Sequence, residues 1–155
     1  MSAGDYLYIK DMVKNVADLL WAVPRLKQLQ HDNTLTESIP ETPMIQVYFE
    51  NMEIAGAGST DRTSFGGKLQ APVRETKVTI NIDLYTRQRS NIGTDMASIH
   101  RYVDEVVKVL EAQNISPFFN LKGVGSFRWR VERAEFDYNN VKYVGLRYVL
   151  TLGVL

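Results

Sequence analysis

The residue types that most often carry out chemistry are sparse in this sequence and fall in no catalytic pattern. Its 155 residues include no cysteine, and its two histidines are His31 and His100. Neither histidine stands at a metal-ligand spacing from carboxylates, and His100 lies off the apolar stripe of its expected helix, which favours a solvent-facing side chain. Acid pairs such as Glu132 and Glu135 are interpreted as surface charge. We therefore predict no catalytic residue, no metal site and no cofactor, and we expect that the protein is not an enzyme.

Two glycine-containing segments come nearest to a phosphate-binding loop. Gly56–Ser59 and Gly66–Lys68 both lack the full glycine–lysine–hydroxyl spacing. Neither segment passes directly from an expected strand into an expected helix, as a phosphate loop does. The sequence therefore predicts no phosphate site in either segment.

Arginines gather around Trp129 near the end of the chain. On a strand, Arg128 and Arg130 project opposite to Trp129 and form a basic patch. Basic and aromatic residues on an exposed sheet can bind single-stranded nucleic acid, which is one interpretation. Because Trp129 shares its parity with Val131 and nearby glutamates dilute the charge, a contact between subunits is the favoured interpretation. The expected subunit interface consists of Arg128, Arg130, Arg133 and Arg147.

Composition excludes several classes of protein. Lysine plus arginine equals aspartate plus glutamate, at 18 each, so the formal net charge is zero. A zero balance argues against a protein that holds nucleic acid by bulk electrostatics. No apolar run is long enough to span a bilayer, and MSAGDYLYIK lacks a secretory signal, so we expect synthesis in the cytoplasm and no membrane partner.

Hydrophobic periodicity predicts two helices. Apolar residues at three- and four-residue spacing indicate one helix over Asp5–Val23, ended by Pro24. A polar connector over Arg25–Pro43 follows, in which the segment LKQLQ is able to add a helical turn. The second helix is expected to begin with Thr94 as its N-cap and Asp95 in its first turn. Its expected apolar stripe is Met96, Ile99, Val103, Val106, Val107 and Leu110.

Period-two alternation predicts four strands. One covers Met44–Glu50, and the next begins at Arg74 with a buried face of Val78, Ile80, Ile82 and Leu84. Between these two strands, Asn51–Val73 is rich in glycine, serine, threonine and alanine and is interpreted as a long loop. Two interpretations are left open: part of it forms an extended β-ribbon that orders against a partner, or it is an insertion with no role. The last two strands lie within Phe127–Leu155, after a connector over Asn114–Gly125.

The C-terminal hairpin is expected to turn at Asn139-Asn140, because Asn tolerates positive φ. In its first strand the apolar residues are odd-numbered up to Val131 and even-numbered from Ala134. Such a change of parity is what a β-bulge produces, so we predict a bulge near Glu132–Ala134.

Together these elements predict one α+β domain over residues 1–155. Its expected fold is a four-stranded, mainly antiparallel sheet with two helices packed on one face and a long loop between the first two strands. The other face is expected to be open and fairly apolar, and the final strand is expected to be an edge. Both features predict self-association. The open face would carry Tyr85, Tyr143, Val149 and Thr151.

The element order, with the segments VTINIDLY, IHRYVDEVVKVL and FRWRVERAEFDYNNVKYVGLRYVLTLGVL, resembles the tail terminator (tail completion) proteins of long-tailed bacteriophages and related head–tail joining proteins. The resemblance implies a hexameric ring that caps the tail tube, ends its polymerisation and meets the head connector or stopper protein. DNA would only pass through the ring, and the protein would reside in the tail or neck of the virion after assembly in the host cytoplasm. The implied docking loop contains Arg62, Phe65 and Lys68.

An alternative of another class is a small dimeric ligand-binding or regulatory domain. Such a protein would hold a metabolite on the open face of its sheet, which requires convergent polar groups. The residues that the sequence offers for that role are Lys77, Asn81, Asp83 and Arg147.

Overall fold

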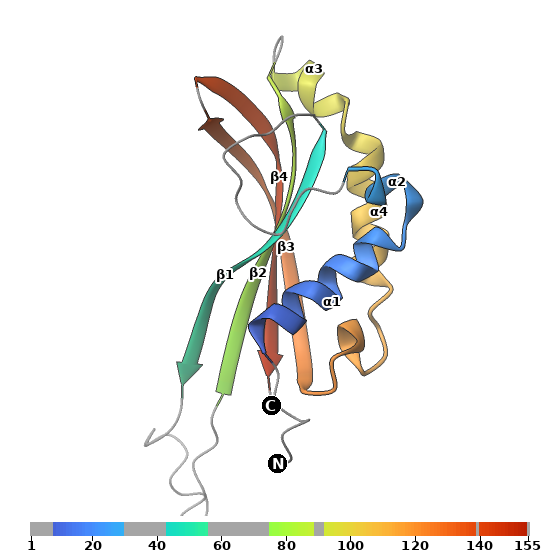
Figure 1. The fold of residues 1–155 in the computed structure, drawn as a ribbon, viewed down its shortest axis with the longest axis vertical. Coiled ribbons are helices and arrows are strands. Elements are labelled where there is room, and N and C mark those ends of the chain that lie inside the picture. Colours follow the sequence, from blue (N-terminus) through green and yellow to red (C-terminus); the bar gives the residue numbers. More distant parts are fainter. Residues whose placement is uncertain (1–7, 30–42, 56–74, 89–91, 139, 155) are drawn as a thin grey trace, which may run out of the picture.

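The computed structural model describes residues 8–29, 43–55, 75–88, 92–138 and 140–154 (Figure 1). Four helices, one 3-10 turn and four strands follow one another in this part of the chain. In order they are α1 (Ile9–Trp21), α2 (Pro24–Lys27), β1 (Met44–Ala55), β2 (Glu75–Arg87), α3 (Ile92–Ala97), α4 (His100–Glu111), the 3-10 turn η3 (Phe118–Asn120), β3 (Val124–Tyr138) and β4 (Val141–Val154).

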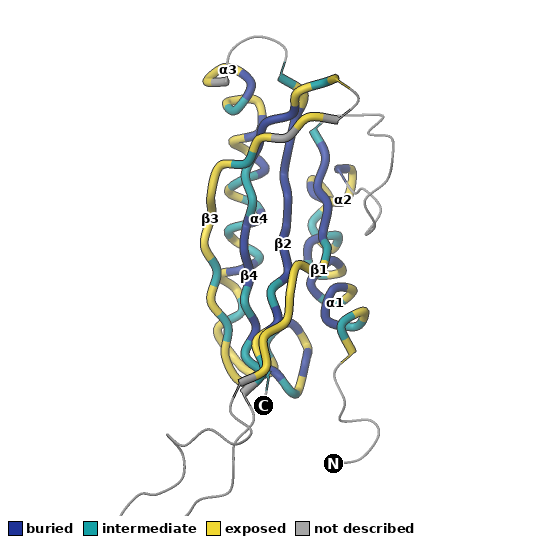
Figure 2. The backbone as a smooth tube through the Cα atoms, turned by 90° about the vertical axis from the view of Figure 1, so that its left-hand side faces the viewer, coloured by how far each residue is buried: buried dark blue, intermediate teal, exposed yellow. Residues whose placement is uncertain are grey.

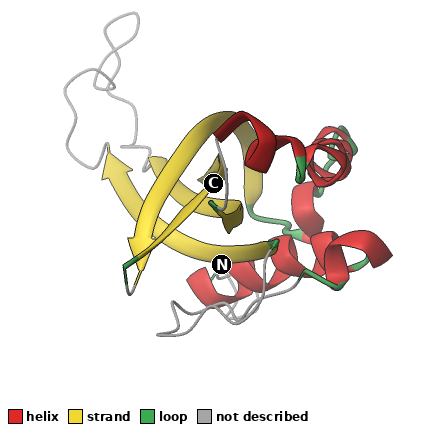
Figure 3. Ribbon diagram, turned by 90° about the horizontal axis from the view of Figure 1, so that it is seen from above, coloured by secondary structure: helices red, strands yellow, loops and turns green. Residues whose placement is uncertain are grey.

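The four strands form one antiparallel sheet in the order β1-β2-β4-β3, and the helices lie on one side of it (Figure 3). This arrangement confirms the predicted α+β class. The expectation that the final strand is an edge is wrong, because β4 pairs with both β2 and β3. β4 is the most continuously apolar strand, and strands buried on both sides take the central positions of a sheet. The edges are β1 and β3.

The helix-facing side of the sheet forms the main core. Val78, Ile80, Ile82 and Leu84 of β2 are completely buried there, as the alternation predicted. Leu150 and Leu152 of β4 are buried beside them. Several fully or nearly fully buried side chains of the helices pack on these strands, namely Val16, Leu20, Leu26, Ile99, Val106 and Leu110.

The first helix and its connector differ from the prediction in one respect. The described helix α1 begins at Ile9, and its predicted first residues lie outside the described part of the chain. Pro24 occupies the first turn of α2, where a missing N–H costs nothing, so the helical turn expected within the connector begins at Pro24 rather than at Leu26. Leu26 of this short helix is completely buried, so α2 helps to close the core.

The second predicted helix is divided into α3 and α4. Thr94 is not the N-cap, because α3 already begins at Ile92, although Asp95 does lie in its first turn. The division falls at Ser98, whose hydroxyl donates a 2.6 Å hydrogen bond to the Asp95 carbonyl and so competes with the helical backbone pattern. Even so, the predicted apolar stripe of α4 faces the core, and His100 is exposed.

Strand β1 continues through Ala55, five residues beyond its predicted end, so Asn51–Ala55 is not part of a loop. Its register against β2 shifts between Phe49 and Asn51, which places a bulge at Glu50. The sequence carries the signal for it, since the apolar residues change from odd at Phe49 to even at Met52 and Ile54. Residues 56–73, the rest of the predicted loop, and Arg74, the predicted start of the next strand, lie outside the described part.

The bulge predicted near Glu132–Ala134 is wrong, because β3 pairs with β4 in unbroken register from Ser126 to Tyr138. The register shift of β3 lies at its start, between Val124 and Ser126. The change of parity has another cause. At this end of the sheet, a second buried cluster of Met44, Tyr85 and Tyr143 stands on the face opposite to the helices, and the two tyrosine rings meet edge to face.

The hairpin turn agrees with the prediction in the part that is described. Tyr138 pairs with Val141, which leaves two residues for the turn, and Asn140 has a φ of 63°. Asn139 lies outside the described residues. Asn is one of the few residue types that adopt this left-handed conformation readily, so the sequence suits the turn.

Candidate functional site: the polar face of the sheet

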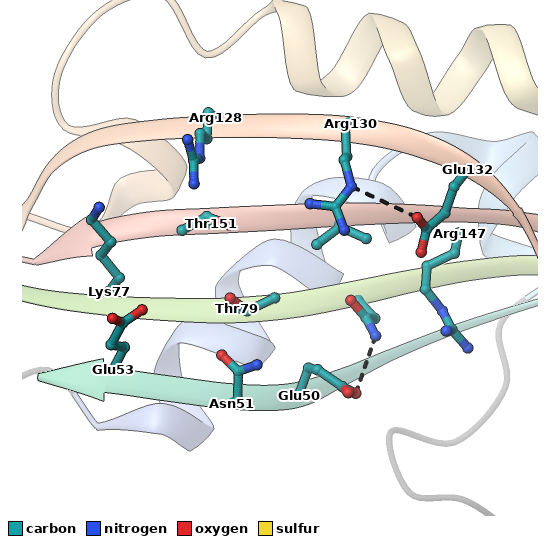
Figure 4. Close-up of a pocket in the computed structure, with 12 residues that line it drawn as sticks. Glu50, Asn51, Glu53, Lys77, Thr79, Arg128, Arg130, Glu132, Arg147 and Thr151 are labelled. Carbon is teal, nitrogen blue, oxygen red and sulfur yellow. Dashed lines mark hydrogen bonds and ion pairs between the residues drawn. The ribbon is translucent and has the colours of Figure 1, made fainter.

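The face of the sheet opposite to the helices carries polar and charged side chains that surround one hollow (Figure 4). We call it the polar face. It is hollowed by about 360 Å³. The prediction of a fairly apolar open face is wrong. Tyr85 and Tyr143 are buried at one end, and Val149 and Thr151 line the hollow among polar and charged residues that include Glu50, Glu53, Lys77, Arg128 and Arg130.

Asp83 and Arg147 form a two-pronged ion pair across β2 and β4. Arg147 Nε donates to Asp83 Oδ1 at 2.9 Å, and Arg147 Nη2 donates to Asp83 Oδ2 at 3.2 Å. The Tyr48 hydroxyl donates to the same Oδ2 at 2.8 Å. These hydrogen bonds from Arg147 to Asp83 raise the pKa of the guanidinium, so Arg147 stays charged. Together with Tyr48, this pair joins β1, β2 and β4.

Asn81 continues this network toward the middle of the hollow. Its side-chain nitrogen donates to Glu50 Oε2 at 3.2 Å and to the Tyr48 hydroxyl at 3.4 Å. Burial raises the pKa of Tyr48 to about 12, so its hydroxyl stays protonated and can donate to Asp83. Asn81 is only 2% exposed, and its Oδ1 accepts no hydrogen bond from the described residues.

Three of the four predicted interface arginines stand on this face. Arg128, Arg130 and Arg147 all line the hollow, as their parity predicted. Arg133 does not join them. It pairs in register with Leu146, whose side chain faces the helices, and it binds Glu135 of its own strand at 2.6 Å. Arg130 lies 3.7 Å from Glu132, and Arg128 forms no ion pair with the described carboxylates.

The charges are sorted from one edge of the sheet to the other. Glu50 and Glu53 stand on β1, whereas Arg128 and Arg130 stand on β3, with Thr79 and Thr151 between them on β2 and β4 (Figure 4). The polar face therefore carries carboxylates along β1, whereas β3 carries two arginines and one carboxylate, Glu132.

Residues named for the ligand-binding alternative also meet here. Lys77, Asn81 and Arg147 line the hollow, and Asp83 is held by Arg147. Because the charges of Asp83 and Arg147 neutralise each other, fewer charged side chains of this set are left to bind a ligand than the sequence predicts. The docking-loop residues Arg62, Phe65 and Lys68 lie outside the described part of the chain.

Sequence reasoning missed the acidic half of this face. The predicted strand ends at Glu50, and the predicted loop contains Glu53. The overlooked signal is the change of parity after Phe49, because a bulge turns the two residues at Glu50 and Asn51 to the same side. Alternation resumes beyond it and directs Glu53 to the polar face.

The part of the chain that the structure describes contains no group of three or more histidine, cysteine or acidic side chains arranged to hold a metal ion. None of its helices has the length and apolar character needed to cross a bilayer.

Comparison with known proteins adds no assignment. No protein-family model matches the chain, and the search of curated proteins found no significant match.

Proposed function

We propose that this protein is a structural subunit of the tail terminator type, or of the related head–tail joining proteins. In this role, identical subunits form a ring, with six as the expected number, on the end of a phage tail tube. The ring stops polymerisation of the tube protein and offers a surface to the connector or stopper protein of the head. DNA passes through the ring without being bound in a sequence-specific way.

The observation that supports the proposal most directly is the open sheet. All helices of the described part cover one face, and the two edge strands are 12 and 15 residues long. Long edges with unpaired backbone groups favour pairing with another chain unless something covers them. An asymmetric subunit with two different edges associates head to tail, and such contacts close into rings when the rotation permits.

The charge of the polar face is compatible with this role. Its arginines and lysine stand among carboxylates, and the Asp83–Arg147 pair is neutral as a unit. A surface that binds DNA tightly presents many lysines and arginines to the phosphates, without carboxylates to neutralise them. A balanced surface suits transit of DNA better than tight binding.

The proposal is tested by measuring the solution mass with light scattering over a concentration series, with electron micrographs of the same samples. Closed rings of several 17.7 kDa chains are the expected result. If the isolated chain is a monomer, purified tail tubes are added, and the terminator role requires that it binds the tube ends and stops their growth. Failure on both counts would contradict the proposal.

A second candidate is the dimeric ligand-binding domain, which the convergence of Lys77, Asn81 and Arg147 on one hollow favours. It predicts a stable dimer of about twice the chain mass and saturable binding of a small polar molecule. Mass and micrographs separate the two candidates, because a closed ring of more than two subunits is incompatible with a dimer.

A further inference from the structure

We propose that the edge strand β1 of one copy pairs with the edge strand β3 of a second copy, so that the sheet continues from subunit to subunit. The inference rests on the proposed self-assembly and specifies the surface that performs it. Among the described residues, β1 pairs only with β2, and β3 pairs only with β4. The outer edges of both strands therefore have no strand partner in the part of the chain that the structure describes.

The free part of β1 is its second half. Near the start of the strand, the Ile45 N–H donates to the Leu29 carbonyl at 2.8 Å, so that end is partly capped by the chain itself. From Phe49 onward, the described residues of β1 are exposed, and β3 is exposed over most of its length (Figure 2). These two stretches are the surfaces that face each other in the proposed pairing.

Strand direction permits this pairing. All neighbours in the order β1-β2-β4-β3 are antiparallel, so β1 and β3 run in opposite directions. A rotation about an axis parallel to the strands preserves their directions. The β3 strand of a rotated copy therefore meets β1 in the antiparallel sense, and every step around the assembly is equivalent.

On the helix-facing side, the two edges are both apolar. Phe49, Met52 and Ile54 of β1 are 38%, 45% and 55% exposed. The corresponding side of β3 presents Phe127 and Trp129, which are only partly buried. Exposed large apolar side chains in a row on one strand are typical of a surface that another chain covers.

The register across the sheet places these apolar residues at matching heights. Phe49, Ile80, Leu150 and Trp129 form one row across the four strands, and Met52, Val78, Leu152 and Phe127 form another. In an assembly without axial offset, Trp129 of the next copy stands opposite Phe49, and Phe127 of the next copy stands opposite Met52. Direct cross-strand pairs of aromatic and apolar residues stabilise a sheet.

On the polar face, the same two edges carry opposite charges. Asn51 is level with Arg128, and Tyr48 is level with Arg130, so the Glu50 between them lies at the height of both arginines. Arg128 has no ion pair with a described carboxylate, and the Arg130–Glu132 contact is long and exposed, at 3.7 Å. Both arginines are therefore available to carboxylates of a second chain at little cost.

The β1 edge and the β3 edge match each other on both faces of the sheet. This match argues that the strand that pairs with each edge belongs to a second copy of this chain. One polypeptide supplies the acidic-apolar edge and the basic-apolar edge at the same height. A foreign partner for either edge would leave the match to the other edge unexplained.

The test uses two charge-reversed variants of the full chain. One carries Arg128→Glu with Arg130→Glu on β3, and the other carries Glu50→Arg with Glu53→Arg on β1. Each variant alone opposes like charges at every junction, so its particle mass is expected to fall to that of one 17.7 kDa chain. An equimolar mixture has opposite charges at every junction and is expected to recover assemblies in which the variants alternate.

The matched control for the arginine replacements is Lys10→Glu with Lys14→Glu, which makes the same change of net charge on exposed positions of α1. It is expected to keep the wild-type mass. Assembly of the separate variants at wild-type mass, or no recovery in the mixture, overturns the edge pairing but leaves the ring proposal standing.

A second measurement tests the same pairing by disulfide formation, which also captures a wild-type contact too weak to raise the particle mass. Because the sequence has no cysteine, Met52→Cys with Phe127→Cys introduces the only two thiols. Oxidation is expected to give a ladder of covalently linked multimers, whereas Met52→Cys with Lys14→Cys gives none. Absence of the ladder overturns the pairing, and the tail-tube experiment then decides separately whether the chain acts as a terminator.

Discussion

At the residue scale, the Asp83–Arg147 pair is the most constrained polar contact of the described structure. The Asp83 side chain is 11% exposed and that of Arg147 is 34% exposed, and the two share two hydrogen bonds. A carboxylate with three donors around it positions β1, β2 and β4 relative to one another. Its loss leaves the Arg147 guanidinium and the Tyr48 hydroxyl without their acceptor.

Asp83→Ala is therefore expected to lower the free energy of unfolding by about 2 kcal/mol, a value reduced from that of a fully buried pair because Arg147 is partly exposed. Urea denaturation measures it. The control is Asp18→Ala, which breaks the 3.3 Å Lys14–Asp18 pair on the exposed side of α1 and should change stability by less than about 0.5 kcal/mol. Equal effects of the two substitutions would show that Asp83 has no structural role.

Asn81 illustrates how a residue can be well placed yet incompletely paired. Its nitrogen joins Glu50 and Tyr48, whereas its Oδ1 accepts nothing from the described residues. A buried acceptor without a donor lowers stability.

At the element scale, close contact between β2 and β4 depends on Gly145. A Cβ at this position would overlap the Leu84 carbonyl oxygen and lie 2.6 Å from Tyr85 Cα, both of which are backbone atoms of β2. Backbone atoms of a central strand cannot move aside without disturbing the ladder. The absence of a side chain at Gly145 thus lets β2 lie close to β4 beside the buried cluster of Met44, Tyr85 and Tyr143.

Gly145→Ala is expected to destabilise the protein by about 3 kcal/mol, because overpacking in a sheet interior forces backbone shifts. Gly153→Ala serves as the matched control on the same strand. There the new Cβ would meet mainly the Ser126 Oγ, the end of a side chain that can rotate away. Thermal unfolding of both variants gives the comparison, and similar melting temperatures would contradict this account of Gly145.

At the scale of the whole molecule, buried tyrosines on both faces of the sheet make the stability of the fold depend on pH. Tyr148 is completely buried on the helix side and donates to the Val103 carbonyl at 3.1 Å, and Tyr85 is 2% exposed on the opposite side. Burial raises the pKa of both phenols above their usual range, and it raises the pKa of Tyr48 to about 12. The folded state therefore holds these protons more tightly than the unfolded state does.

Since the folded-state pKa values are raised, this stabilisation is complete below the unfolded value of about 10 and is lost as pH rises through the folded values. The protein is expected to lose stability between about pH 10 and 12, by up to about 1.4 kcal/mol per pH unit for each tyrosine. Tyr85→Phe should make the loss shallower, whereas Tyr8→Phe at an exposed position should not. Urea midpoints over this pH range, with tyrosinate absorbance, provide the measurement.

The class of fold and the buried faces of the main elements follow from the amino-acid sequence alone. Val78, Ile80, Ile82 and Leu84 alternate along one strand, and the pattern is local, so it can be read without knowing the neighbours. The same holds for the apolar stripe of α4 and for the opposite orientation of Arg128 and Trp129. Local periodicity fixes which side of an element is buried, because successive side chains of a strand point in opposite directions.

Which strands form the edges and which charges meet depends on how the strands pair in three dimensions. β4 lies inside the sheet, β1 continues past a bulge at Glu50, and Arg147 reaches Asp83, 64 positions away in the sequence. The arginines on β3 and the carboxylates on β1 become opposite edges of one face through strand order and register. These depend on pairing between distant segments, which no local pattern contains, because each strand would satisfy its own alternation equally well beside a different neighbour.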